Sequence, residues 1–205
     1  MRKLKITEII LIINIVVYII LAVLSLNPIV ISNNILIWVA EYNYLVLFYF
    51  FYYQIVSAIF VHLNLAHLLS NSLFLLIFGY RCEDFYSTFK YLNIYLISGI
   101  VGNLLSLLFG PNFLSGGSSG AIFGIFSATL YALSSKEKES FKAYLLIGIL
   151  FLIFSGAQYG VNPISHWSGF ITGLLLGKYL LQNSAHDNNP KNSQKKHKKK
   201  ILLKS

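Results

Sequence analysis

Six long apolar runs, in which the only charged residues are Glu8 and Lys178 toward the ends of the first and last runs, are the feature that most constrains how this 205-residue chain folds. An α-helix needs about 20 predominantly apolar residues to cross the hydrocarbon core of a bilayer, and each run is close to that length. Only 11% of the residues are charged, against about 25% in a soluble domain. We therefore expect transmembrane helices at about residues 7–26, 62–80, 91–109, 118–134, 143–160 and 164–182.

The alternative is that most of the later runs are core helices of a soluble protein. The chain is 56% hydrophobic and has too little polar sequence to cover such a core. We expect an all-α, polytopic membrane domain over residues 1–182, followed by a basic, disordered tail over 183–205. The first run is too long for a cleavable signal peptide and lacks an Ala-x-Ala-like site after it, so we interpret it as a retained anchor.

The 16 Lys and Arg residues predict the orientation of this domain. They lie before the first run, after the second and fourth runs, and at the end of the sixth run and beyond it. The connections 27–61, 110–117 and 161–163 contain none. By the positive-inside rule, both termini are expected on the cytoplasmic side.

Three of the runs carry polar side chains near the end that this topology places outside. Polar groups inside a bilayer are energetically costly and usually functional. Their common depth therefore indicates that they could form one site. They are His62, His67 and Asn71 in "VHLNLAHLLSNSL", Ser118 and Ser119 in "GGSSGAIFG", and Ser165 and His166 in "NPISHWSGFITG". We expect these three clusters to meet.

Glycines indicate which of these helices approach each other. Small residues four apart let transmembrane backbones come close. The run at 118–134 carries such a pair and the run at 164–182 carries a longer series, namely Gly120 and Gly124, and Gly169, Gly173 and Gly177. We expect the two helices to be neighbours, which would bring Ser119 to His166.

This combination of residues suits nucleophilic catalysis. A serine hydroxyl becomes a good nucleophile when a positioned imidazole takes its proton. The free N–H groups at the start of a helix lie at the positive end of its dipole and can stabilise a developing oxyanion. His67 and Asn71 are four residues apart, so they share a helix face and offer further polar groups.

Together, "HLNLAHLLSN", "GSSG" and "HWSGFITG" resemble the motifs of rhomboid intramembrane serine proteases of the minimal six-helix form, in order and over residues 62–177. The resemblance implies that Ser119, rather than Ser118, is the nucleophile and that His166 is the general base. It also implies an oxyanion hole formed by the Ser119 N–H and the side chains of His67 and Asn71. Supporting roles are implied for Gly117, Gly120 and Phe123.

The same resemblance implies a loop between the first two helices that lies partly in the outer leaflet. Residues 27–61 fit this role, since eight of the twelve residues from Tyr42 to Tyr53 are aromatic. The chain departs from the family at two places. Tyr53 and Gln54 stand where relatives often have Trp-Arg, and Phe123 stands where they often have a tyrosine that packs on the base histidine.

Each motif taken alone also has a structural interpretation. Ser118 and Ser119 could simply be small residues that permit close helix packing. His67 and Asn71 could form a hydrogen-bond pair between helices. His62 is better explained as a loop anchor than as a catalytic group, and Trp167 as an interfacial anchor. The "KKHKKK" cluster is basic enough to bind nucleic acid. Because it lies beside a bilayer, however, anionic lipid is the simpler binding partner.

Other functional classes lack the residues that they need. None of the seven acidic residues lies in the middle of a run, which excludes a two-aspartate membrane protease. No His-Glu-x-x-His motif is present, and histidines without a catalytic carboxylate make a poor zinc hydrolase. A small transporter is disfavoured because inverted repeats and buried charge are missing. A catalytically inactive rhomboid-like factor that binds membrane proteins or assists their quality control remains the alternative.

The sequence thus predicts a serine endopeptidase with a Ser-His dyad and neither a cofactor nor a metal. Its expected partners are single-span membrane proteins, cut near the extracytoplasmic face, and anionic lipid at the tail, with no nucleic acid. The expected location is the cell membrane.

Overall fold

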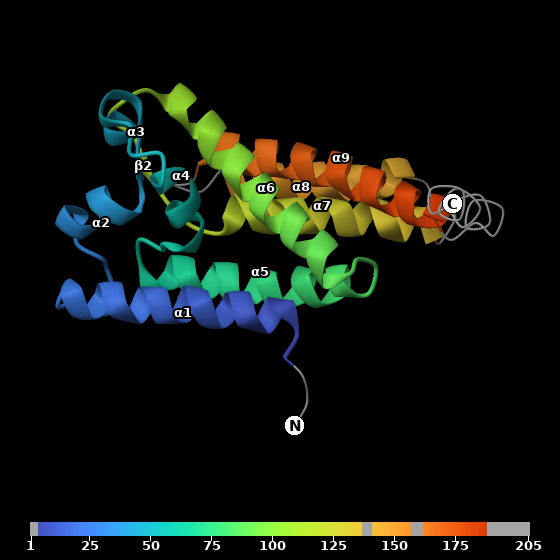
Figure 1. The fold of residues 1–205 in the computed structure, drawn as a ribbon, viewed down its shortest axis with the longest axis horizontal. Coiled ribbons are helices and arrows are strands. Elements are labelled where there is room, and N and C mark those ends of the chain that lie inside the picture. The colour runs from blue at the N-terminus through green and yellow to red at the C-terminus, as the bar shows by residue number, and fades with distance from the viewer. Residues whose placement is uncertain (1–3, 137–140, 157–161, 188–205) are drawn as a thin grey trace, which may run out of the picture.

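The computed structural model describes residues 4–136, 141–156 and 162–187. Within these ranges the chain is mostly helical, with a two-stranded sheet at one end (Figure 1). The long helices are α1 (Ile6–Leu24), α5 (Leu65–Glu83), α6 (Thr88–Ser106), α7 (Ser119–Lys136), α8 (Phe141–Gly156) and α9 (Pro163–Asp187). Each lies mainly within one predicted run. Residues 157–160, Lys138 and positions 188–205 of the predicted tail lie outside the described residues.

Three described helices are long and apolar enough to cross a bilayer, namely α1, α5 and α6 with the following 3₁₀ turn η2 (Leu107–Phe109). α7 is a shorter apolar helix over Ser119–Ser135. The largest boundary difference concerns α9, which ends at Asp187 rather than at 182, so the first residues of the expected disordered tail are helical. α5 begins at Leu65 rather than at 62. The Asn64 side chain accepts a hydrogen bond from the His67 N–H at 2.8 Å and so caps the helix start.

The bundle is organised around α7. This helix contacts α5, α6, α8 and α9, and its residues from 120 to 130 are all buried. A helix that is apolar and buried on every side belongs at the centre of a bundle. α1 lies along α5 and exposes much of its surface, whereas α8 and α9 lie beside α7 (Figure 1). α7 is therefore surrounded by α5, α6, α8 and α9.

Polar contacts distinguish the two ends of the bundle. At one end, the Thr7 N–H and hydroxyl both donate to Glu83, and Lys90 donates to the Leu180 carbonyl. The start of α1, the end of α5 and the later part of α9 thus meet there. The opposite end holds the short elements, as Figure 1 shows: α2 (Asn33–Val39), β1 (Glu41–Tyr42), α3 (Asn43–Tyr49), α4 (Gln54–Ser57), the 3₁₀ turn η1 (Ala58–Phe60) and β2 (Leu114–Ser115).

The segment 27–61 combines an exposed aromatic surface with a buried polar attachment. The exposed rings are Trp38, Tyr44, Phe48, Tyr49, Phe50, Tyr52 and Tyr53. Gln54 is fully buried; its carboxamide donates to the Ile37 carbonyl and accepts from the Tyr42 N–H. The Tyr53 hydroxyl donates to the Trp38 carbonyl at 2.7 Å. Tyr53 and Gln54 are thus uncharged groups whose hydrogen bonds attach the segment to itself.

Candidate active site

The serine-containing turn lies between β2 and α7. β2 pairs antiparallel with β1, so the chain arrives at Gly116 from a fixed strand, and the Gly117 N–H donates to the Ala58 carbonyl at 2.8 Å. Gly117 has φ +124°, a conformation that side-chain-bearing residues rarely adopt. The turn then leads directly into the first residue of α7, Ser119. The serine is thereby placed on a helix N-terminus.

Gly117 also lies against the polar face of α5. A Cβ atom at this position would lie 2.6 Å from His67 Cε1, 2.7 Å from His67 Nε2 and 3.2 Å from Asn71 Nδ2. Space and backbone conformation therefore both require glycine. The contact places the His67 and Asn71 side chains over the turn that carries Ser119.

The side chains of Ser119 and His166 meet directly. His166 Nε2 lies 2.9 Å from Ser119 Oγ. With the ring proton on Nδ1, the serine hydroxyl donates to Nε2, which is the arrangement that a general base needs. His166 is 7% exposed, while Ser119 is half-buried. Phe123, one turn after Ser119, packs on the imidazole with ring centroids 4.6 Å apart.

Glycine contacts explain how the two helices come close enough for this bond. A Cβ atom at Gly169 would overlap the Gly120 carbonyl, and one at Gly173 would overlap the Gly124 carbonyl. The backbones of α7 and α9 are therefore in direct contact. Ser165 fills the space beside Gly120, where a Cβ atom would lie 2.6 Å from its Oγ.

The adjacent serine belongs to a different pair. Ser118 is fully buried, and its Oγ lies 3.3 Å from Nε2 of His62, which is also fully buried. The His62 ring is in edge contact with His67, with centroids 5.3 Å apart. His62 precedes the helix cap at Asn64, so its direction does not follow the periodicity of α5. The sequence carried no signal for a His62–Ser118 pair.

Asn71 offers an uncommitted donor at this place. Its side chain is 5% exposed, and Nδ2 has no hydrogen-bond partner within the described part of the chain. Buried polar groups are usually hydrogen-bonded, so an unpaired amide beside a candidate nucleophile suits a transient negative charge. The geometry thus gathers Ser119, His166, His67, Asn71, Gly117 and Phe123 into one cluster.

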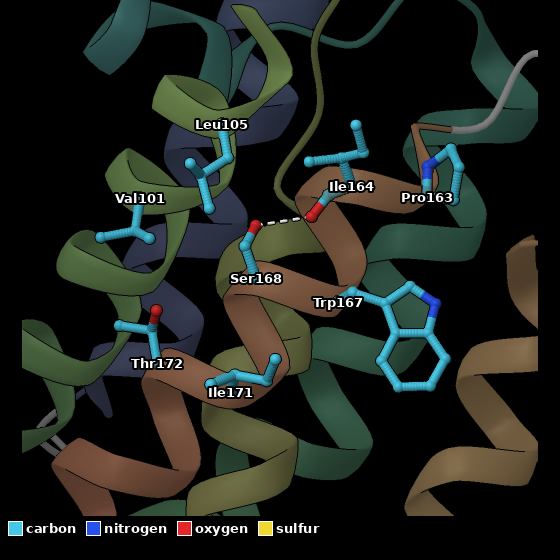
Figure 2. Close-up of a pocket in the computed structure, with 8 residues that line it drawn as sticks. All are labelled: Val101, Leu105, Pro163, Ile164, Trp167, Ser168, Ile171 and Thr172. Atoms are coloured by element: carbon cyan, nitrogen blue, oxygen red, sulfur yellow. Dashed lines mark hydrogen bonds between the residues drawn. The ribbon is translucent and has the colours of Figure 1, made fainter. Parts of the chain in front are cut away.

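Besides this cluster, two further kinds of site are relevant within the described residues, a metal site and an apolar groove. Among the described residues, no group of three His, Cys, Asp or Glu side chains could hold a metal ion. An apolar groove of about 370 Å³ lies between α6 and α9, lined by Val101, Leu105, Pro163, Ile164, Trp167, Ser168, Ile171 and Thr172 (Figure 2). The Ser168 hydroxyl in this groove donates to the Ile164 carbonyl of its own helix. No member of the Ser119–His166 cluster lines the groove.

Comparison with known proteins places these motifs in a family. Residues 50–183 match the Rhomboid domain. The chain belongs to the rhomboid family. The match covers all of the clustered residues, and it confirms the resemblance seen in the sequence. Membership of this family, together with the long apolar helices, makes the chain an integral membrane protein.

Several curated rhomboid proteins are similar to this chain. RHOMBOID-like protein 2 of Arabidopsis thaliana is 37% identical over 134 residues, which are 63% of this chain and 42% of that protein. Rhomboid protease GluP of Bacillus subtilis (strain 168) is 35% identical over 127 residues, 62% of this chain and 25% of that protein. Rhomboid-like protease 3 of Toxoplasma gondii is 34% identical over 134 residues, 62% of this chain and 51% of that protein. This rhomboid chain matches about half or less of each relative.

Proposed function

We propose that this rhomboid protein is an intramembrane serine endopeptidase that uses a Ser119–His166 dyad. The observation that carries the proposal is the 2.9 Å contact between His166 Nε2 and Ser119 Oγ at the N-terminus of α7. Two of the similar proteins are named as proteases, which supports the same chemistry.

The proposed reaction proceeds by acyl transfer. Ser119 Oγ attacks the carbonyl carbon of the scissile peptide bond while its proton moves to His166 Nε2. His166 then returns that proton to the leaving amine as the C–N bond breaks, which leaves an ester on Ser119. Water, deprotonated by the same imidazole, hydrolyses the ester and restores the hydroxyl.

The proposed oxyanion hole combines backbone and side-chain donors. The Ser119 N–H lies in the first turn of α7, where backbone donors have no intrahelical acceptor and the helix dipole is positive. Asn71 Nδ2 and His67 Nε2 are the side-chain donors that lie against the adjacent Gly117. Such preorganised donors act on charge that develops only in the transition state.

The proposed topology has six spans and cytoplasmic termini. The connection 110–117 and the segment 27–61, which lack Lys and Arg, lie at the same end of the bundle as Ser119. This arrangement supports cleavage near the extracytoplasmic face. The proposed location is the cell membrane, and the proposed substrates are single-span membrane proteins. A single domain over residues 1–182 would carry out this cleavage. The lysine-rich tail over 183–205 would bind anionic lipid. α8 would act as part of the substrate gate, a role suited to a helix with exposed Leu146, Leu150 and Ile153.

A cleavage assay with the full-length protein in proteoliposomes tests the proposal. A single-span substrate is incubated with the wild type and with His166→Ala, and the cleavage site is mapped by mass spectrometry. We expect cleavage only by the wild type, which alone should also be labelled efficiently by a fluorophosphonate. A wild type that is folded but neither cleaves nor labels would instead favour an inactive rhomboid-like factor that binds or helps degrade membrane proteins.

A further inference from the structure

Glu41 is a buried carboxyl group that the proposed reaction does not use. Its side chain is fully inaccessible to solvent, and it stands in β1 directly opposite Ser115 of β2. The Ser115 hydroxyl donates to Glu41 Oε2 at 3.4 Å, and the Ser106 hydroxyl of α6 also lies close to the carboxyl group. An acidic side chain is rarely buried in this way, so its contacts need an explanation.

Ser115 and Asn162 connect this carboxyl group to both halves of the candidate dyad. Ser115 lies two residues before Gly117, on the strand that leads to Ser119. Asn162 Nδ2 donates to Ser115 Oγ at 3.4 Å and also to Ser106 Oγ. Asn162 caps α9: its side chain accepts from the Ser165 N–H at 3.0 Å, and its backbone carbonyl accepts from the His166 N–H at 3.2 Å. One chain of polar contacts therefore runs from Glu41 to the nucleophile turn and to the helix start that holds His166.

The environment of Glu41 favours the protonated carboxyl group. Burial raises its pKa from 4.5 to about 8, because desolvation disfavours the carboxylate more than the hydrogen bonds of Ser115 and Ser106 stabilise it. α2, α4 and β2, which pack against β1, carry no ionisable side chain. α3 adds only Tyr44 and Tyr49, and β1 itself adds Tyr42. At neutral pH the group is a carboxylic acid, which has one O–H donor as well as acceptor capacity. Oε2 accepts from Ser115, and Oε1 has no hydrogen-bond partner among the described residues.

We propose that Glu41 is a positioning residue, whose carboxyl group acts through Ser115 and Asn162 to hold the nucleophile turn and the start of α9 at the separation where Ser119 meets His166. This inference rests on the proposed proteolytic function. Glu41 makes no contact with the reacting atoms in this role. It acts on the distance between them, to which catalysis is sensitive, since a shift of about 1 Å can cost about a hundredfold in rate.

The test uses Glu41→Leu, Glu41→Gln and Ser115→Ala in the full-length protein. The matched control is Glu83→Gln, which alters a hydrogen-bonded carboxyl group at the opposite end of the bundle. For each variant, kcat and KM are measured on a single-span substrate, per active site titrated with a fluorophosphonate, together with the melting midpoint. We expect Glu41→Leu to lower kcat by about ten- to a hundredfold with little change in KM, because the substrate is not touched. Ser115→Ala should lower kcat in the same direction.

The pH profile separates positioning from a purely structural role. As the pH rises through about 8, Glu41 ionises, loses its donor and becomes a buried carboxylate, so wild-type kcat should fall. Glu41→Gln keeps a donor and an acceptor in the same shape, so it should retain kcat at pH 7 and lack this fall. Glu83→Gln should keep both the wild-type kcat and the wild-type profile.

Two results would overturn the inference while the proposed function stands. The first is a wild-type kcat per titrated site in Glu41→Leu and Ser115→Ala, even with lowered melting midpoints. The second is an alkaline fall that Glu41→Gln shares with the wild type. If Glu41→Leu does not fold, Glu41→Gln and Ser115→Ala decide the question. A folded wild type that neither cleaves nor labels would overturn the proposed function itself, and the inference with it.

Discussion

His62 Nε2 lies 3.3 Å from Ser118 Oγ, whereas the next serine, Ser119, faces His166 at 2.9 Å. Two adjacent hydroxyl groups are thus divided between two histidines on different segments. Ser118 and His62 are both fully buried, while Ser119 is half-buried. A substrate can therefore reach Ser119 but not Ser118 without rearrangement of the core.

This division predicts opposite effects of two alanine substitutions. Ser119→Ala should abolish cleavage and fluorophosphonate labelling, because the attacking oxygen is lost. Ser118→Ala should keep substantial activity but lower the free energy of unfolding by about 1–3 kcal/mol, because the buried His62 loses its partner. Cleavage assays and thermal melts measure both effects, with Ser135→Ala on the exposed end of α7 as the control. An active Ser119→Ala and an inactive Ser118→Ala would reverse the assignment of the nucleophile.

The contact of His67 and Asn71 with Gly117 predicts a kinetic signature. If these side chains donate to the oxyanion, His67→Ala and Asn71→Ala should each lower kcat more than they raise KM. We expect a decrease of about ten- to a thousandfold for each, since several donors share the task. The control is Leu69→Ala, which alters an exposed residue of the same helix. An unchanged kcat per titrated site with lowered melting midpoints would assign both residues a structural role only.

The backbone contact between α7 and α9 predicts that Gly173 tolerates no side chain. In Gly173→Ala the new methyl group would overlap the Gly124 backbone, which cannot move aside as a flexible side chain does. We expect the free energy of unfolding to fall by about 1–3 kcal/mol and kcat to fall as α9 shifts. Leu175→Ala, at an exposed position of the same helix, should change kcat little. Equal kcat values for Gly173→Ala and the wild type would mean that the dyad does not depend on this contact.

The proposed orientation predicts which connections are accessible from outside the cell. Asn112 and Ser87 are both exposed and lie in different connections. In a Cys82→Ala background, a cysteine at Asn112 should react with an impermeant maleimide on intact cells. A cysteine at Ser87 should react only after the membrane is permeabilised. The opposite pattern of labelling would refute the cytoplasmic placement of the termini.

The long helices could be predicted from the sequence because apolar runs of this length have few alternatives. The predicted run at 7–26 contains almost all of α1, and the run at 118–134 contains most of α7. Helix ends were less predictable. The second run was expected to begin at 62, but Asn64 caps the helix and leaves His62 outside it, because apolar residues continue across the boundary and hide it.

The short elements of the segment 27–61 could not be predicted. α2, α3 and α4 have between four and seven residues, which is too short for a helical period to stand out. The pairing of Glu41 with Ser115 joins residues 74 positions apart, and no local pattern in either strand indicates it. Glu41 was notable in the sequence only as an acidic residue outside the apolar runs.

The sequence by itself determined the membrane class, the approximate positions of the long helices and the family whose motifs the chain carries. Those properties follow from composition and from residues close together along the chain. Only the tertiary structure decided that Ser118 pairs with His62, that Gly117 lies under His67 and Asn71, and that Glu41 is connected to the start of α9. These relationships depend on how closely distant backbones approach, and that distance is set by side-chain volumes and hydrogen bonds across the whole bundle.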